Sequence, residues 1–183
     1  RRQWHHAGAP LVEAAVQRGN RRFRQRDQLG LRRVEHLACA LALAEEGCSI
    51  VLNARNDERL RAAAGRIAAA TGADVAPIAA DLNTEAGRGS LLASCAEPDI
   101  LINNNAGPPP GTLGDWDHAA WLAALEANLL AAALLMRAVL PGMRERRFGR
   151  IVNITSAMVK TPHAAMGLST AARAGLTALS RAL

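Results

Sequence analysis

From Leu37 onward, short apolar runs alternate with longer segments rich in Ala and Leu. The short runs contain β-branched residues and are typical of buried strands, whereas the longer segments have the period of helices. Strands are expected at 49–53, 74–79, 99–103 and 150–154. Helices are expected at 37–46, 56–70, 84–96, 116–139 and 166–182. Regular alternation of this kind predicts a parallel sheet with helices on both faces.

Glycine and proline mark the ends of several of these elements. Gly47 follows the first helix, and Pro141-Gly142 is expected to close the long helix over 116–139. Pro77 stands inside the second strand and cannot donate a ladder hydrogen bond. We therefore expect that strand at an edge of the sheet.

Residues 1–36 show neither the apolar period of a helix nor that of a strand. A short helix over 14–16 is conceivable, but nothing there predicts a buried strand, and Gly19 and Gly30 are isolated. A doubly wound sheet normally opens with a strand and a glycine-rich turn. We therefore predict an α/β, doubly wound parallel sheet that is incomplete, without its first and last strands. The boundaries are an irregular basic segment at 1–36 and a partial dinucleotide-binding domain at 37–183.

Charge is concentrated in the first segment. Residues 1–36 hold nine of the 22 basic residues and three of the 16 acidic residues, so the rest of the chain is balanced. A basic tail suggests nucleic-acid binding, but no helix-turn-helix or zinc pattern accompanies it. A frameshift upstream of Leu37, a genuine basic extension and a chimeric chain are the alternative explanations. We expect no nucleic-acid partner.

Three cysteines, Cys39, Cys48 and Cys95, lack metal-ligand spacing, so we expect no metal site and a reducing compartment. No secretory signal and no apolar run of membrane-spanning length stands out. We therefore expect a cytoplasmic protein with no membrane partner. The chain contains no tyrosine, which excludes a phenol as its general acid.

Polar residues follow three of the predicted strands, at the edge where such sheets bind ligands. Asn53 and Arg55 end the first, and an arginine there suits a nucleotide 2′-phosphate, although an exposed structural Arg is as good an explanation. Asp81-Leu82 follows the second, where Asp can also be a helix cap. The run 103–107 (Asn-Asn-Asn-Ala-Gly) follows the third and favours close approach of a flat ligand, unless it is only a turn.

Two further polar residues stand in apolar surroundings. Asn128 lies within the long helix, where Asn is disfavoured without a partner. Ser156 follows the fourth strand, at the position where a catalytic hydroxyl is expected in this architecture.

Taken together, these motifs resemble the short-chain dehydrogenase/reductase family, and within it the 3-oxoacyl carrier-protein reductases. The resemblance covers about residues 37–183 and rests on Asn-Asn-Ala-Gly after one strand, Asn128 in the next helix, and Asn-Ile-x-Ser ending at Ser156. It implies a Rossmann-like fold and NAD(P)-dependent interconversion of a carbonyl and an alcohol. The implied substrate is a small carbonyl or alcohol, and the resemblance to the reductases extends this class to 3-oxoacyl thioesters.

The resemblance also assigns roles to single residues. Asp81, with Leu82, corresponds to the residue near the adenine, and Arg55 beside Asn53 resembles the variants that prefer NADP(H) over NAD(H). Asn128 corresponds to the residue that orders a proton-relay water, and Ser156 to the one that binds the substrate oxygen. The cofactor-side motif corresponds to Asn104, Asn105, Ala106 and Gly107.

The chain departs from the family at the proton donor. Ser169 and Arg173 stand where the family has Tyr and Lys. A serine hydroxyl is a much poorer acid than a phenol, while Arg173 could still hold ribose hydroxyls. Lys160 or His163 could donate a proton from the loop, or be solvated loop residues.

Two functions remain open beside the nucleic-acid alternative: an oxidoreductase, or a non-catalytic NADP-binding sensor or partner subunit. Family analogy also implies a homo-oligomer that pairs through the long helix and the last one.

Overall fold

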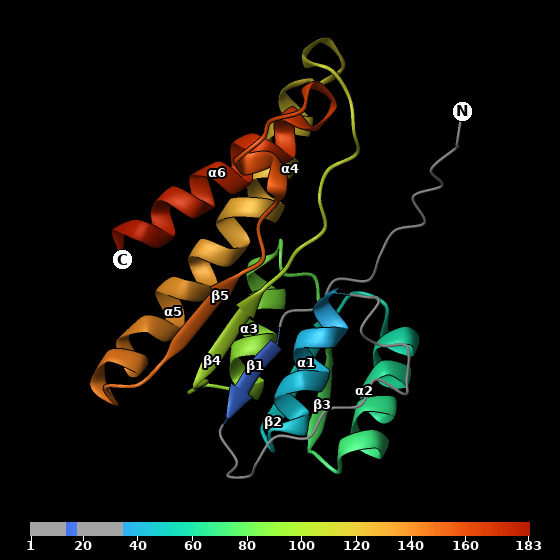
Figure 1. Cartoon of the computed structure of the whole chain (residues 1–183), viewed down its shortest axis with the longest axis vertical. Helices are drawn as coiled ribbons and strands as arrows, with labels where there is room; N and C mark the ends of the chain where they lie inside the picture. The colour runs from blue at the N-terminus through green and yellow to red at the C-terminus, as the bar shows by residue number, and fades with distance from the viewer. Residues whose placement is uncertain (1–13, 18–34) are drawn as a thin grey trace.

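The structure, a computed structural model, describes residues 14–17 and 35–183. Five strands form one sheet with helices on both faces (Figure 1). The strands are β1 (Ala14–Gln17), β2 (Ser49–Ala54), β3 (Val75–Ala79), β4 (Ile100–Asn103) and β5 (Arg150–Asn153). The α-helices are α1 (Glu35–Glu45), α2 (Asp57–Thr71), α3 (Glu85–Ser94), α4 (His118–Leu125), α5 (Ala131–Glu145) and α6 (Gly167–Ala182). Short helical turns are η2 (Leu113–Asp115), η4 (Ala157–Val159) and η5 (Ala164–Met166), and η3 (Glu126–Leu130) is π-helical.

The sheet order is β3-β2-β1-β4-β5. β2 pairs with β3, and β4 with β5, in parallel. The carboxyl ends of these four strands therefore meet at one edge of the sheet, as the sequence predicts. β3 is an edge strand, which agrees with the expectation from Pro77.

The prediction that the first strand is missing was wrong. β1 fills the central position between β2 and β4, but it runs antiparallel to both. The neighbouring strands β2 and β4 each present backbone groups that need hydrogen-bond partners. Pairing with both strands outweighs the weak preference of this short segment for a strand. Because β1 is reversed, its last residue, Gln17, pairs with Ser49 at the edge opposite to the strand carboxyl ends. The rest of the predicted segment 1–36 lies outside the described residues, apart from the start of α1.

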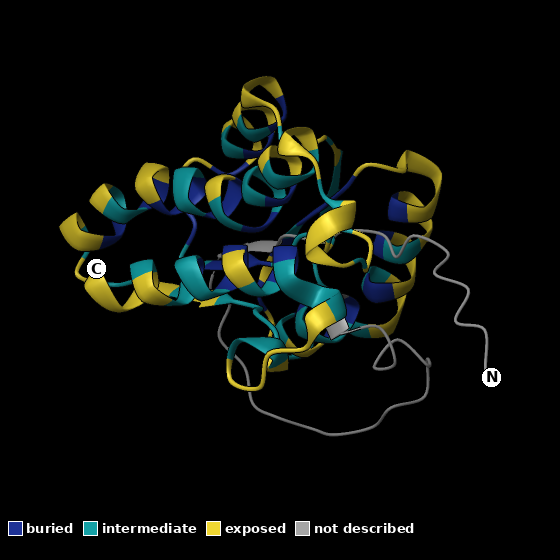
Figure 2. Ribbon diagram, turned by 90° about the horizontal axis from the view of Figure 1, so that it is seen from above, coloured by how far each residue is buried: buried dark blue, intermediate teal, exposed yellow. Residues whose placement is uncertain are grey.

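Two clusters of apolar side chains form the core, one on each face of the sheet. On one face, Ile50 and Leu52 of β2 pack against α1 and α2. On the other, Leu101 of β4 packs against α3, α5 and α6, with Leu135 of α5 fully buried. Figure 2 shows buried residues on the inner sides of the helices and exposed ones on the outer sides.

The expected long helix differs from prediction at both ends. It begins at His118, because the Asp117 side chain caps it by accepting from the Ala120 amide. It continues beyond Pro141 to Glu145. Pro141 lacks an amide donor, but Val139 and Met143 on either side of it are buried in the core, and this packing outweighs the lost hydrogen bond.

By length and composition alone, the helical run His118–Glu145 is long and apolar enough to cross a membrane. This finding corrects the expectation that the chain has no apolar run of membrane-spanning length. Core helices have the same composition, and here Leu135 and Met136 are buried against the sheet.

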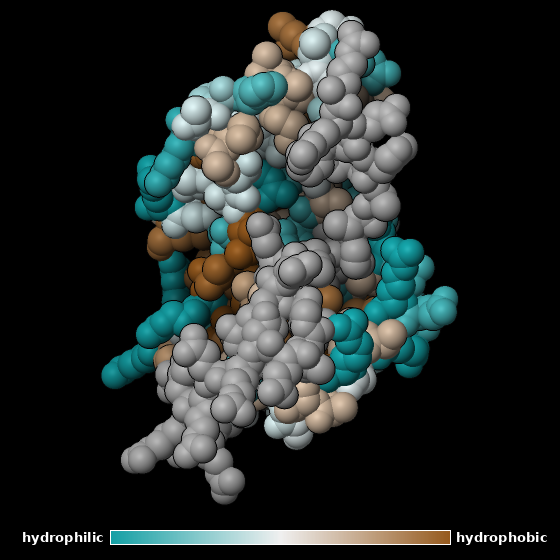
Figure 3. All heavy atoms as spheres, turned by 45° about the vertical axis from the view of Figure 1, so that its right-hand side comes forward, coloured by the Kyte–Doolittle hydropathy of each residue, from teal (hydrophilic) through white to brown (hydrophobic). Residues whose placement is uncertain are grey.

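The described surface is not uniformly polar. Figure 3 shows apolar residues in the middle of one face, bordered by hydrophilic ones. Val152 of β5 is 43% exposed, so its strand is covered on only one face by described residues.

Candidate functional site

A cavity of about 370 Å³ lies beside the carboxyl ends of the strands. Its lining includes the loop after β4, the Asn83 turn after β3, and residues of α4 and η3. Arg55, Asn83 and Asn105 supply polar groups, while Trp116 and Leu168 supply apolar surface. The volume is in the range of small-molecule sites.

The loop after β4 is held in shape by its own asparagines. The Asn105 Oδ1 accepts a hydrogen bond from the Ala106 amide at 2.8 Å, and its Nδ2 donates to Asn83 Oδ1 at 3.1 Å. Asn104 is half-buried between them and β4, and Gly107 is exposed beside the cavity. Asn105, Ala106 and Gly107 of the predicted motif therefore line the cavity in a loop held by hydrogen bonds, whereas Asn104 does not line it.

Asn128 connects this loop to the long helix. It is buried in η3, and its Nδ2 donates to the Ala106 carbonyl at 3.1 Å and to the Ala124 carbonyl at 3.3 Å. Its Oδ1 is buried and has no hydrogen-bond partner among the described residues. A buried acceptor without a partner calls for a water or ligand donor. The π-helical turn was not predicted; such turns are frequent at functional sites.

Arg173 of α6 joins the ends of β4 and β5. Its guanidinium donates to the Ile154 carbonyl at 2.5 Å, the Thr155 carbonyl at 3.4 Å and the Asn105 carbonyl at 2.9 Å. The residue is only 9% exposed, and burial lowers the pKa of its side chain from the ordinary value. Arg173 therefore holds two loops of the site together through their backbones.

Ser169 lies one helical turn before Arg173 and is buried. A Cβ built on Gly107 would lie 3.9 Å from the Ser169 Oγ, so this hydroxyl is next to the loop after β4. The structure thus brings Ser169, Arg173, Asn128 and the Asn105–Gly107 loop into one cluster.

Ser156 caps the turn η4, where its Oγ accepts from the Met158 amide at 3.2 Å. It is half-buried and directly follows Thr155, one of the carbonyls that Arg173 binds. Lys160 and His163 are exposed in the following loop. The Nδ1 of His163 accepts a hydrogen bond from the Ala165 amide at 3.3 Å.

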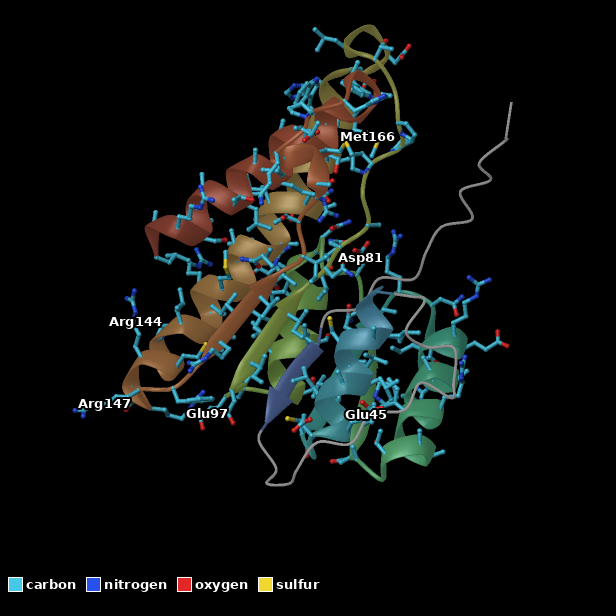
Figure 4. All side chains as sticks on the ribbon, in the orientation of Figure 1. Glu45, Asp81, Glu97, Arg144, Arg147 and Met166 are labelled. Atoms are coloured by element: carbon cyan, nitrogen blue, oxygen red, sulfur yellow. The ribbon has the colours of Figure 1, made fainter. Side chains whose placement is uncertain are left out.

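The predicted nucleotide-side residues divide into exposed and buried ones. Arg55 is exposed and lines the cavity. Asp81 is exposed at the same end of the sheet (Figure 4), and its Oδ1 accepts from the Asn83 amide at 3.0 Å. Leu82 is buried in the core. Asn53 is fully buried and donates to the Ile78 carbonyl at 2.8 Å, so its side chain joins β2 to β3 instead of lining the cavity.

Sequence reasoning missed nine of the residues that line the cavity, and Asn83 and Trp116 are the two with the clearest contacts. Asn83 is the side-chain partner of Asn105, and its place two residues after Asp81 was the only signal. Trp116 lines the apolar part, packs edge-on against Trp121 at 6.1 Å between ring centres, and would clash with any Cβ at Gly167. No group of three His, Cys, Asp or Glu side chains in the described residues could hold a metal ion.

Comparison with known proteins adds independent information. The sequence profile of the family described as short chain dehydrogenase matches residues 37–183. The chain is 32% identical to an acetoacetyl-CoA reductase of Allochromatium vinosum over 77% of its own length and 59% of the relative's. It is 33% identical to a human inactive hydroxysteroid dehydrogenase-like protein 1, over 80% of this chain and 46% of that protein.

Among solved structures, L-sorbose reductase from Gluconobacter frateurii, complexed with NADPH and L-sorbose, matches with a TM-score of 0.76 and 30% identity. That match covers 80% of this chain and 57% of the reductase. The chain thus spans well under two thirds of the length of these relatives. The expected Rossmann-like α/β fold class and the family resemblance are confirmed.

Proposed function

Because the chain belongs to the short-chain dehydrogenase family, we propose that it is part of an NADP(H)-dependent oxidoreductase that interconverts a carbonyl and an alcohol. The observation that carries this proposal is the cluster at the carboxyl ends of β4 and β5. There Arg173 and Asn128 hold the Asn105–Gly107 loop beside a cavity of ligand size. A 3-oxoacyl-thioester-like compound is the proposed substrate class, supported by the acetoacetyl-CoA reductase among the relatives.

The cofactor residues fit NADP(H) on the nucleotide side. The exposed guanidinium of Arg55 lies beside the cavity, where it would hold the 2′-phosphate, and Asp81 and Asn83 would lie along the adenosine. When bound, the nicotinamide supplies the hydride. The unpartnered Oδ1 of Asn128 would hold a water on the proton path. The reversed β1 supplies no glycine-rich turn at this edge in the described residues, so it offers the pyrophosphate no backbone donors of that kind.

A second candidate is a non-catalytic NADP-binding subunit. The chain has no tyrosine, and Ser169 stands at the proton-donor position. Arg173 directs its guanidinium to backbone carbonyls, which supports a structural role for it. The human relative that is named an inactive hydroxysteroid dehydrogenase-like protein also supports this candidate.

The proposal also covers assembly and location. A homo-oligomer would pair through α5 and α6, where Leu183 is 55% exposed beside the exposed outer side of α5. This pairing rests on family analogy. We propose a cytoplasmic location and no nucleic-acid partner from the sequence, and no membrane partner because Leu135 and Met136 of the long apolar helix pack in the core.

Changing Arg55 to Ala is expected to weaken NADPH binding about tenfold or more and to leave NADH binding unchanged, because only NADPH carries the 2′-phosphate. Fluorescence titration of both nucleotides measures this. Arg59→Ala, another exposed arginine four residues along, is the matched control. Equal weakening of both nucleotides would contradict the assignment, and binding of neither by the unaltered chain would sink the proposed function.

The double change Ser169→Tyr with Arg173→Lys separates the two candidates. For the oxidoreductase, we expect NADPH-dependent reduction of acetoacetyl-CoA to rise by a factor on the order of 10² or more, since a general acid contributes that much. NADPH binding is measured in parallel to establish that the site is intact. Bound NADPH without any gain in turnover would favour the non-catalytic subunit.

A further inference from the structure

A second cavity of about 370 Å³ lies at the opposite edge of the sheet, where α5 ends and β5 begins. Its floor is apolar and at least half-buried, whereas its rim carries exposed cations. The floor includes Met143, Phe148 and Ile151, and the rim consists of Arg144, Arg147 and Arg150. Neither the candidate active site nor the predicted motifs include any of these residues.

The end of α5 has a backbone motif that normally requires glycine. The Phe148 amide donates to the Met143 carbonyl and the Arg147 amide to the Arg144 carbonyl, both at 3.0 Å. This is the Schellman pattern, in which the residue at the position of Arg147 is left-handed and usually Gly. Arg147 has a φ of 53°, the only positive φ of a non-glycine residue in the described chain. A side chain here costs about 1–2 kcal/mol, so folding alone does not account for an arginine.

The rim cations are available to a ligand. Neither the Arg144 nor the Arg147 guanidinium has a hydrogen bond or ion pair with any described residue, and Figure 4 shows both extending from the end of α5. Their neighbour Arg146, by contrast, forms an ion pair with Glu97, with 3.4 Å between Arg146 Nη1 and Glu97 Oε1. Attraction to the helix C-terminus explains one cation such as Arg144. It does not explain a second cation in a left-handed residue.

The third rim arginine stands against the apolar floor. The Arg150 guanidinium lies over the Phe148 ring at 5.0 Å and donates to the Gly149 carbonyl at 2.7 Å. This stacking holds the Phe148 ring in place as part of the apolar floor. Cations above an apolar floor match a ligand with a charged head and an apolar tail.

We infer that this cavity binds a medium-chain carboxylate of the fatty-acid class. The carboxylate would pair with the Arg147 guanidinium, whose planar donors match its two oxygens, while Arg144 adds positive charge from the last turn of α5. The tail would lie along Met143, Phe148 and Ile151. The site is independent of the proposed oxidoreductase activity, because it lies at the other edge of the sheet.

Titration calorimetry with sodium octanoate tests the site on the whole chain and on Arg147→Gly. Glycine fits the left-handed position, so this variant is expected to melt at the same or a higher temperature while binding octanoate about tenfold more weakly. Arg137→Ala, also exposed on α5 but away from this cavity, is the control and should bind octanoate like the unaltered chain. The basic residues 1–36 are present in every variant, so any binding to them is common to all.

Octanol and inorganic phosphate are the comparison probes, and each is expected to bind more weakly than octanoate. If octanol bound as tightly as octanoate, the arginines would contribute nothing to the affinity. If phosphate bound as tightly, the apolar floor would contribute nothing. Unchanged octanoate affinity in Arg147→Gly, or no saturable octanoate binding by the unaltered chain, would overturn the inference. So would binding to anionic vesicles in the absence of octanoate binding.

Discussion

Changing Arg173 to Met is expected to lower the free energy of unfolding by about 3–4 kcal/mol. The arginine donates to the carbonyls of Ile154, Thr155 and Asn105, and removing it leaves these half-buried acceptors without their protein donor. Leaving a buried acceptor without its donor costs about 1–3 kcal/mol, so the loss of donors to several carbonyls accounts for the expected change. Urea unfolding followed by circular dichroism measures the change.

The control for this prediction is Arg181→Met in the last turn of the same helix. Arg181 is exposed, so its loss should change the free energy of unfolding by less than about 0.5 kcal/mol. Arg173→Lys should recover no more than about half of the loss, because one ammonium cannot reproduce the spread donors of a guanidinium. A loss below about 1 kcal/mol in Arg173→Met would show that these carbonyls do not need the arginine.

Changing Gly87 to Ala is expected to lower the free energy of unfolding by about 2–3 kcal/mol, as overpacking does in a closed site. A Cβ at Gly87 would lie 2.0 Å from the Asp81 carbonyl oxygen, which is backbone and cannot rotate away. The change would also displace the Thr84 hydroxyl that caps α3 through the Gly87 amide. Because the turn from Asp81 to Asn83 must move, NADPH affinity should fall together with stability.

Gly89, two residues further along α3, supplies the matched control. A Cβ there meets nothing within 4 Å, so Gly89→Ala should stabilise the protein by about 0.5–1 kcal/mol through helix propensity. Thermal unfolding of the two variants side by side should give shifts of opposite sign. A stabilised Gly87→Ala would mean that the turn between Asp81 and Thr84 adapts at little cost.

The sequence by itself determined what depends on residues near one another in the chain. Apolar runs and their periods predicted four parallel strands and the helices between them, because period and burial are linked within each element. The cap of α2 is likewise local, because the Oδ1 of Asn56 accepts from the Arg59 amide, three residues along, at 2.9 Å. The same local order placed the Asn-Asn-Ala-Gly loop, Asn128 and Ser156 toward one edge of the sheet.

Only the tertiary structure decided the contacts between distant residues. Arg173 reaches a carbonyl of Asn105, 68 positions away, and no local pattern indicates that its donors bind backbone. Packing also carried α5 through Pro141 and turned the Asn128 segment into a π-helix. β1 was decided in the same way, since its direction depends on the two strands that it pairs with. Propensity and capping act over one helical turn, whereas pairing and burial are set by whichever segments the whole fold brings together.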